Sequence, residues 1–188
     1  MKNNAVFLDR DGTINVDIHY LHDPDQFLMY PGVGNGVKRL RDDGFKVIVI
    51  TNQSGIGRGF FTEQQLSRIH ERMKDDFLHF DVILDGIYYC PHHPDEHCRC
   101  RKPNTGLFER AIIDHDIDVR NSFMIGDKIL DIGAGIRAGA RTILIPEPHI
   151  HEELIAQKHL WEYSPDFIAS NFSDAVTWIL KMKRPQLL

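Results

Sequence analysis

"AVFLDRDGT", residues 5–13, is a short apolar run that stops abruptly at two acidic residues and a glycine. Residues 5–8 have the length and apolar character of a buried strand, and Gly12 lets the backbone turn sharply once that strand has ended. Asp9 and Asp11 stand two apart on an extended segment, so their carboxylates can face the same way. The stretch therefore predicts a strand that delivers two acidic groups to one edge of a sheet.

Four further β-rich runs follow the first, and segments with helical spacing of apolar residues separate them. The runs are "KVIVI" (46–50), "VILDGIYY" (82–89), "SFMI" (122–125) and "TILI" (142–145), and the helical segments are 33–43, 63–79, 106–114 and 129–139. Thr62 followed by "EQQ" is typical of a capping box at a helix start. Alternating strands and helices predict the α/β class, here a Rossmann-like three-layer sandwich with a central parallel sheet.

Length and composition limit the organisation of the chain. With 188 residues, 42% hydrophobic and 26% charged, we expect one domain over residues 1–188 with a frayed tail at 184–188. The formal charge of −5 argues against nucleic acid or an anionic membrane as the main partner. No apolar run has the length of a secretion signal or a membrane span, so we expect a cytoplasmic protein, by default a monomer.

Polar segments directly follow four of the predicted strands. They read "DRDGT" (9–13), "TNQSG" (51–55), "CPHHP" (90–94) and "GDKILD" (126–131). Any one of them alone is equally typical of a turn or a helix cap. Because the carboxyl ends of parallel strands meet at one edge of the sheet, four such segments together favour an active site.

The residue types at this edge indicate phosphoryl transfer. Asp9 and Asp11 can act as an ionised nucleophile and a protonated acid, and Asp127 can join Asp9 around magnesium, which prefers oxygen ligands. Thr51 and Asn52 offer a hydroxyl and an amide for a phosphate, while Lys102 and the neighbouring Arg101 add positive charge. A metal, phosphate donors and paired carboxylates suit that chemistry together.

All three cysteines lie within eleven positions of the chain, in "CPHHPDEHCRC" (90–100). Cys90 and His92 form one short pair and Cys98 and Cys100 another, which together make a tetrahedral Cys₃His zinc set. Three scattered buried cysteines beside a histidine-rich loop are the alternative, and His93 and His97 are possible substitutes for His92. The spacing favours zinc held by Cys90, His92, Cys98 and Cys100.

The motifs "DRDGT", "TNQSG", "RKP" and "GDKILD" resemble, in order, the four signatures of the haloacid dehalogenase superfamily of aspartate-nucleophile phosphatases. Within it, "FLDRDGTIN", "TNQSGIGRG", "DGIYYCPHHP" and "CRCRKP" are similar to the heptose 1,7-bisphosphate phosphatase family. The resemblance implies removal of the 7-phosphate of a phosphorylated sugar in nucleotide-activated heptose synthesis. The histidinol-phosphate phosphatases share the cysteine loop, and the short stretch from His92 to Cys98 is nearer to theirs in length.

The resemblance also implies a role for each matched residue. Asp9 would be the nucleophile and Asp11 the general acid and base, with magnesium on Asp9, the backbone carbonyl of Asp11, and Asp127. Thr51 and Lys102 would steady the phosphoryl group, and Asp131 would support the metal site from behind. The positions that would contact substrate are Asp17, Ile18, His19, Tyr20, Thr51, Asn52, Gln53, Ser54, Arg101, Lys102 and Lys128.

The zinc loop is expected to have a structural role. Between residue 51 and Lys102 there is no room for the large cap domain of many relatives, and four protein ligands leave zinc no open position for catalysis. The loop would instead fix Arg101 and Lys102 at the substrate. A non-catalytic interaction protein on a decayed phosphatase fold is the remaining alternative, which the intact acidic residues disfavour.

Overall fold

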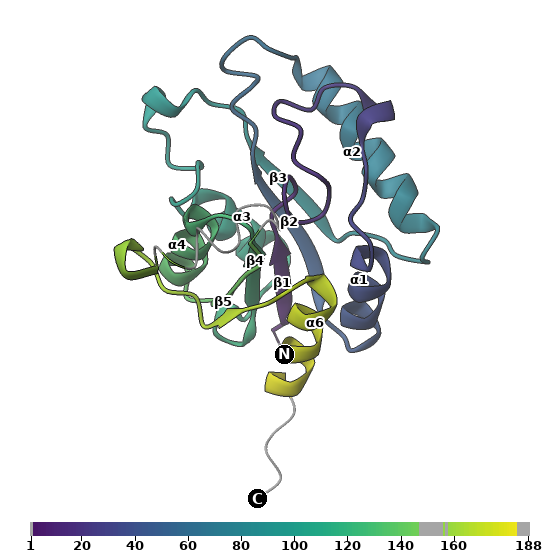
Figure 1. Ribbon diagram of the computed structural model, residues 1–188, viewed down its shortest axis with the longest axis vertical. Coiled ribbons are helices and arrows are strands. Elements are labelled where there is room, and N and C mark those ends of the chain that lie inside the picture. The colour runs from purple at the N-terminus through teal and green to yellow at the C-terminus, as the bar shows by residue number, and fades with distance from the viewer. Residues whose placement is uncertain (1, 147–155, 157, 184–188) are drawn as a thin grey trace, which may run out of the picture.

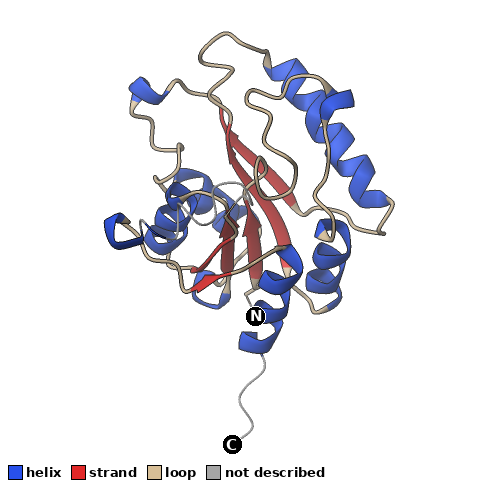
Figure 2. Cartoon of the chain, viewed as in Figure 1, coloured by secondary structure: helices blue, strands red, loops and turns tan. Residues whose placement is uncertain are grey.

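A six-stranded parallel sheet forms the centre of the computed structural model, which describes residues 2–146, 156 and 158–183 (Figure 2). The strand order is β3–β2–β1–β4–β5–β6, and every neighbouring pair is parallel. Because the chain steps outward from β1 to β3 and then returns to β4 beside β1, the order reverses at the β1–β4 boundary, where α/β proteins bind ligands. The strands are β1 (Ala5–Leu8), β2 (Lys46–Asn52), β3 (Gly86–Cys90), β4 (Phe123–Gly126), β5 (Arg141–Leu144) and β6 (Phe167–Ile168).

Helices cover both faces of the sheet and complete three layers (Figure 1). On one face lie α1 (Val33–Asp42), α2 (Glu63–Leu78) and α6 (Phe172–Lys183), and on the other α3 (Gly106–Asp114) and α4 (Ile129–Ala138). Single 3-10 turns occur at Pro24–Gln26, Pro94–Glu96, Val119–Asn121 and Lys158–Leu160. The predicted α/β sandwich is confirmed.

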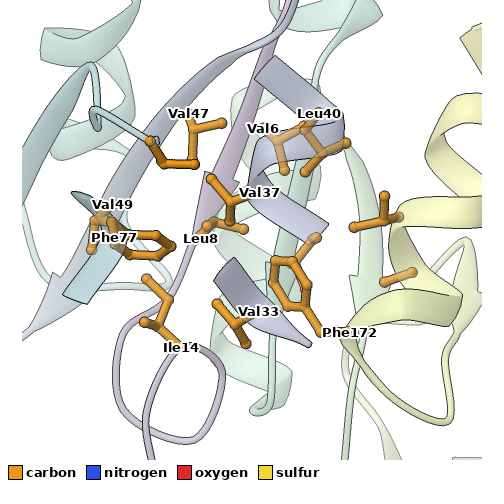
Figure 3. Close-up of a cluster of buried hydrophobic side chains, with 14 of the residues drawn as sticks. Val6, Leu8, Ile14, Val33, Val37, Leu40, Val47, Val49, Phe77 and Phe172 are labelled. Carbon is orange, nitrogen blue, oxygen red and sulfur yellow. The ribbon is translucent and has the colours of Figure 1, made fainter. Parts of the chain in front are cut away.

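Alternating side chains of β1 supply the core on both faces. Val6 and Leu8 pack under α1, α2 and α6, as Figure 3 shows for part of that cluster, whereas Ala5 and Phe7 pack under α3 and α4. All four side chains are fully buried. A strand buried on both faces loses the polar–apolar alternation of a surface strand, which explains why "AVFL" is uniformly apolar.

The predicted strand over 82–89 is wrong at its start, since β3 spans Gly86–Cys90. The amide of Val82 donates to the carbonyl of Phe77 at the end of α2, so the first apolar residues of this run close the helix. Asp85 then uses its carboxylate to accept from the amide of Val47 and to bind Lys46. Other predicted boundaries shift by a residue or two, and β6 and most of α6 were not predicted.

Loops lead from β2 and β3 at the carboxyl edge to the helices α2 and α3. The predicted capping box starts α2, since Thr62 and Gln65 exchange hydrogen bonds between side chain and backbone. Residues 53–62 form a loop, and residues 91–105 form a second loop that contains the 3-10 turn at Pro94–Glu96. The helix between these loops, α2, packs on the sheet, so no cap domain interrupts this part of the chain. Among the described residues, no helix has the length and apolar character needed to cross a bilayer. The predicted tail at 184–188 lies outside the described residues.

Candidate active site

Lys102 joins two buried carboxylates at the centre of the carboxyl edge. Its Nζ lies 2.7 Å from Asp9 Oδ1, 2.7 Å from Asp131 Oδ1 and 2.8 Å from the carbonyl oxygen of Ile50. Asp9 directly follows β1, and its amide donates to the carbonyl of Ile125, which holds the residue in line with the sheet. Three acceptors around one buried ammonium satisfy it fully, so burial is outweighed and the pKa of Lys102 rises above its usual value.

Asp127, at the end of β4, brings a third carboxylate to the same point. Oxygen atoms of Asp9, Asp127 and Asp131 all lie within 4.8 Å of one another, and all three residues are buried. Burial raises the pKa of Asp9 to about 6 against the opposing charge of Lys102. Burial, together with repulsion from Asp131 and Asp9, raises the pKa of Asp127 to about 9.

This cluster has the chemistry of a hard-cation site. Lys102 pairs with Asp9 and Asp131, whereas Asp127 lies 3.5 Å from Lys128. Burial and mutual repulsion raise the pKa values of Asp9 and Asp127, and a divalent cation among the carboxylates would offset both effects. The all-oxygen donor set fits magnesium. Asp131 lies in the cluster itself and pairs with Lys102, closer to the centre than the supporting position predicted for it.

The carboxylate of Asp11 lies outside this cluster and is surrounded by hydrogen-bond donors. It accepts from Arg10 Nη2 at 2.7 Å, Gln53 Nε2 at 2.9 Å and Asn15 Nδ2 at 3.0 Å. Burial alone would raise the pKa of Asp11, but the charge of Arg10 and the bonds from Asn15 and Gln53 hold it below its usual value. The donors around Asp11 therefore favour its ionised form.

A cleft of about 330 Å³ opens over these groups. It brings together most residues that the sequence predicted, while Ile18, though exposed, does not line it. Gly55 and Leu130 line it without having been predicted. The lining residues are Asp9, Asp11, Asp17, His19, Tyr20, Thr51, Asn52, Gln53, Ser54, Gly55, Arg101, Lys102, Lys128, Leu130 and Asp131.

Two cations besides Lys102 line the cleft, Arg101 and Lys128. Lys128 Nζ lies 3.0 Å from Asp17 Oδ2 and 3.5 Å from Asp127 Oδ2; burial acts to lower its pKa, but these carboxylates raise it, so it stays charged. Arg101 Nη1 is buried and has no hydrogen-bond partner within the described ranges. A buried guanidinium donor without a partner is costly, and an anionic group in the cleft would satisfy it.

The four predicted zinc ligands converge on one point. Sγ atoms of Cys90, Cys98 and Cys100 and Nδ1 of His92 lie within 4.8 Å of one another, with neighbouring pairs 3.1–3.5 Å apart. A tetrahedral ion with Zn–S bonds of about 2.3 Å requires edges of roughly 3.7 Å, close to this spacing. The cluster is consistent with a zinc site. His93 is engaged elsewhere, since it caps the 3-10 turn at Pro94–Glu96.

Backbone contacts connect the zinc loop to the cleft. The Asn52 side chain donates to the carbonyl of Lys102 at 3.2 Å and accepts from its amide at 3.0 Å. Gly57 donates to the carbonyl of Pro91, and a Cβ on Gly57 would lie 2.4 Å from the amide nitrogen of His93. The loop at residues 53–62 therefore packs directly on the cysteine loop, and both border the substrate cleft.

Curated relatives match three quarters or more of the chain. D-glycero-beta-D-manno-heptose-1,7-bisphosphate 7-phosphatase of Haemophilus ducreyi is 49% identical over 76% of this chain and 82% of its own. The enzyme of the same name from Escherichia coli (strain K12) is 40% identical over 96% of both chains. This chain belongs to the heptose bisphosphate phosphatase family.

Other similarities agree with this membership in the heptose bisphosphate phosphatases. A crystal structure of D,D-heptose 1,7-bisphosphate phosphatase from B. bronchiseptica, complexed with magnesium and phosphate, superposes with a TM-score of 0.84 at 29% identity, covering 95% of this chain and 99% of that one. A family model described as HAD-hydrolase-like matches residues 99–175. The resemblance to the haloacid dehalogenase superfamily is confirmed.

Sequence reasoning missed two buried residues of this phosphatase site, Arg10 and His70. Arg10 is fully buried beside Asp11, and His70 on α2 lies against it. The sequence could have indicated Arg10, because an arginine between two acidic residues at the end of a buried strand must be paired if it is buried. Nothing in the local sequence of α2 marks His70.

Proposed function

We propose that this protein is a magnesium-dependent phosphatase that hydrolyses the 7-phosphate of D-glycero-D-manno-heptose 1,7-bisphosphate through an aspartyl phosphate on Asp9. The observation that carries the proposal is the cluster of Asp9, Lys102, Asp127 and Asp131 at the β1–β4 boundary. Membership in the heptose bisphosphate phosphatase family supports the substrate. We further infer that residues 1–188 form one catalytic domain that acts as a cytoplasmic monomer.

In the first half-reaction, an oxygen of Asp9 attacks phosphorus and the bond from phosphorus to the sugar oxygen breaks. Asp11 gives its proton to that leaving oxygen, having taken this proton from solvent when the negative charge of the entering phosphate raised its pKa. In the second, Asp11 takes a proton from water, the water oxygen attacks phosphorus, and the bond to Asp9 breaks. Asp9 is restored and inorganic phosphate leaves.

The remaining groups hold the transferring phosphoryl group. Lys102 offers an ammonium, and Thr51, whose Oγ1 accepts from Gln53, has its own hydroxyl proton to donate to a phosphoryl oxygen. Asp9, Asp127 and the backbone carbonyl of Asp11 would hold magnesium, with Asp131 fixing Lys102 beside it. The ion supplies charge neutralisation for the phosphoryl oxygens.

The second phosphate of the substrate would bind near Arg101 and Lys128. Lys102 and the metal would satisfy the phosphate that is cleaved, which leaves the unpartnered Arg101 Nη1 for a second anionic group. Lys128, although paired with Asp17 and Asp127, adds positive charge to the same cleft. Histidinol phosphate carries an ammonium there instead and would be repelled. Zinc on the cysteine loop would hold Arg101 in place.

Comparative kinetics test this proposal. We expect kcat/KM for the heptose bisphosphate to exceed that for histidinol phosphate by about three orders of magnitude or more. Arg101→Ala should reduce the ratio of the two kcat/KM values. Arg99→Ala, which removes a side chain that is 91% exposed two residues away, should leave this ratio unchanged. Equal efficiencies in the wild-type enzyme would overturn the assignment in favour of histidinol phosphate, and the lack of any magnesium-dependent hydrolysis would favour a non-catalytic protein.

A further inference from the structure

Arg10 is the largest fully buried residue in the described part of the chain. A guanidinium removed from water is tolerated only when its charge is paired and its N–H groups find acceptors. Its charge is paired with Asp11, because Nη2 lies 2.7 Å from Oδ2 and 2.9 Å from Oδ1, and Nε lies 3.1 Å from Oδ1. This fork orients the carboxyl group that acts as acid and base.

The other side of the guanidinium contacts a histidine from a distant helix. Arg10 Nη1 lies 3.4 Å from His70 Nε2, and His70 is only 7% exposed on α2. Arginine has no lone pair to offer, so Nε2 of His70 must be the acceptor and its proton must be on Nδ1. Burial, reinforced by the charge of Arg10, lowers the pKa of His70 to about 3, which keeps the ring neutral and able to accept.

Gln53 closes the network on the substrate side. Its carbonyl oxygen accepts from Arg10 Nη2 at 3.3 Å, while its amide donates to Asp11 Oδ2 at 2.9 Å and to Thr51 Oγ1 at 2.8 Å. The contacts therefore run without a break from α2 through Arg10 to Asp11, and onward to the hydroxyl that would hold the phosphoryl group. Within this network His70 touches neither the cleft nor the proposed metal cluster.

We propose that His70 is a positioning residue, which fixes the guanidinium of Arg10 so that Arg10 holds Asp11 where it can protonate the leaving oxygen. The inference rests on the proposed function of Asp11. Without the acceptor at His70, a buried N–H of a charged group loses its partner, and the guanidinium must turn to recover one. Because Arg10 and Asp11 share a two-pronged contact, the carboxyl group moves with it, and small displacements of a catalytic group reduce rates strongly.

The test compares two leaving groups in single-turnover experiments with enzyme in excess. A sugar alkoxide needs a proton as it leaves, whereas a phenol of low pKa leaves without one. His70→Leu should slow release from the heptose bisphosphate by about tenfold to hundredfold, but release from an activated aryl phosphate by less than about threefold. His70→Gln, whose side-chain oxygen can accept from Arg10, should remain within about threefold of wild type on both substrates.

His79→Leu is the matched control, because His79 lies exposed at the end of the same helix. It should behave like wild type on both substrates. An equal loss on both substrates for His70→Leu would show a general structural effect, and no loss on either would show that His70 positions nothing; each result overturns the proposal. If His70→Leu does not fold, Arg10→Lys, which keeps the charge but not the fork, should show the same dependence on the leaving group.

The leaving-group comparison tests the role of His70 separately from the identity of the substrate. Should wild-type enzyme fail to hydrolyse the heptose bisphosphate, the proposed function fails, and the leaving-group comparison proceeds with whichever alkyl phosphate the enzyme does hydrolyse. The ratio of alkyl to aryl rates in the variants then decides the role of His70 alone.

Discussion

Replacing Gly12 by alanine should disable the metal cluster through a single methyl group. Gly12 has a φ of +87°, and an added Cβ would lie 2.4 Å from Asp127 Oδ2 and 2.5 Å from its Cγ. Ordinary contact begins at 3.4 Å, so the carboxylate must retreat by about 1 Å. Asp127 would then no longer converge with Asp9 and Asp131.

Two separate effects are expected. The left-handed backbone should lower the free energy of unfolding by about 1–2 kcal/mol, or roughly 2–8 °C in Tm for a chain of this size. The displaced ligand should lower kcat by about a hundredfold and raise the magnesium concentration needed for half-maximal activity. Thermal unfolding and magnesium titrations of activity measure them independently.

Gly32→Ala is the control that separates strain from collision. Gly32 has a nearly identical φ of +84° but no atom within 4 Å of the position of a Cβ. It should show the same loss of stability with unchanged kcat and magnesium requirement. Wild-type magnesium dependence in Gly12→Ala, or an equal loss of activity in Gly32→Ala, would refute the reasoning.

Three further predictions concern the nucleophile, the zinc loop and the edge of the sheet. Asp9→Asn should abolish turnover in a folded protein, because an amide does not attack phosphorus; near-normal hydrolysis by a sample verified by mass spectrometry would contradict the aspartyl phosphate. Cys98→Ser should lose the zinc that we expect to co-purify at about one per chain, and should raise KM; a zinc-free but fully active wild-type protein, measured by elemental analysis, would remove the structural role. Asp85→Asn should lower the free energy of unfolding at neutral pH by about 1–3 kcal/mol, since its carboxylate binds Lys46 and the amide of Val47. Burial opposes ionisation of Asp85, but these partners outweigh it and lower its pKa in the folded protein. The contribution of Asp85 to the free energy of unfolding is therefore present above the unfolded pKa of about 4 and is lost as the pH falls through the folded pKa. Urea midpoints of the variant that differ from wild type equally at pH 7 and well below pH 4 would contradict this.

The sequence located the site because parallel strands impose a simple rule. Once β1 and β4 were identified by their apolar runs, Asp9 and Asp127 had to emerge at the same edge, and the structure places them in one cluster. The convergence of Cys90, His92, Cys98 and Cys100 could be predicted equally well, since they lie close in the chain and short spacing restricts their geometry.

Contacts between distant segments escaped prediction for a physical reason. The position of a residue after a predicted strand tells which edge of the sheet it reaches, but not which side chain it contacts there. Lys102 thus pairs with Asp131 as well as with Asp9, and Arg10 reaches His70 on α2, although neither contact follows from local pattern. The apolar residues of α6 do recur at helical spacing, so that helix had a signal; the two-residue β6 has almost none.

The hydrogen bonds from Asn52 to Lys102 also bear on how this family can change. They fasten Lys102 to β2, while Cys90 lies in β3, so both ends of the intervening segment are anchored to neighbouring strands. Doubling the length of a flexible loop adds only about 0.6 kcal/mol to the cost of closing it. A change in the number of residues between His92 and Cys98, the stretch that separates the two pairs of predicted zinc ligands, should therefore vary substrate recognition while Lys102 keeps its register.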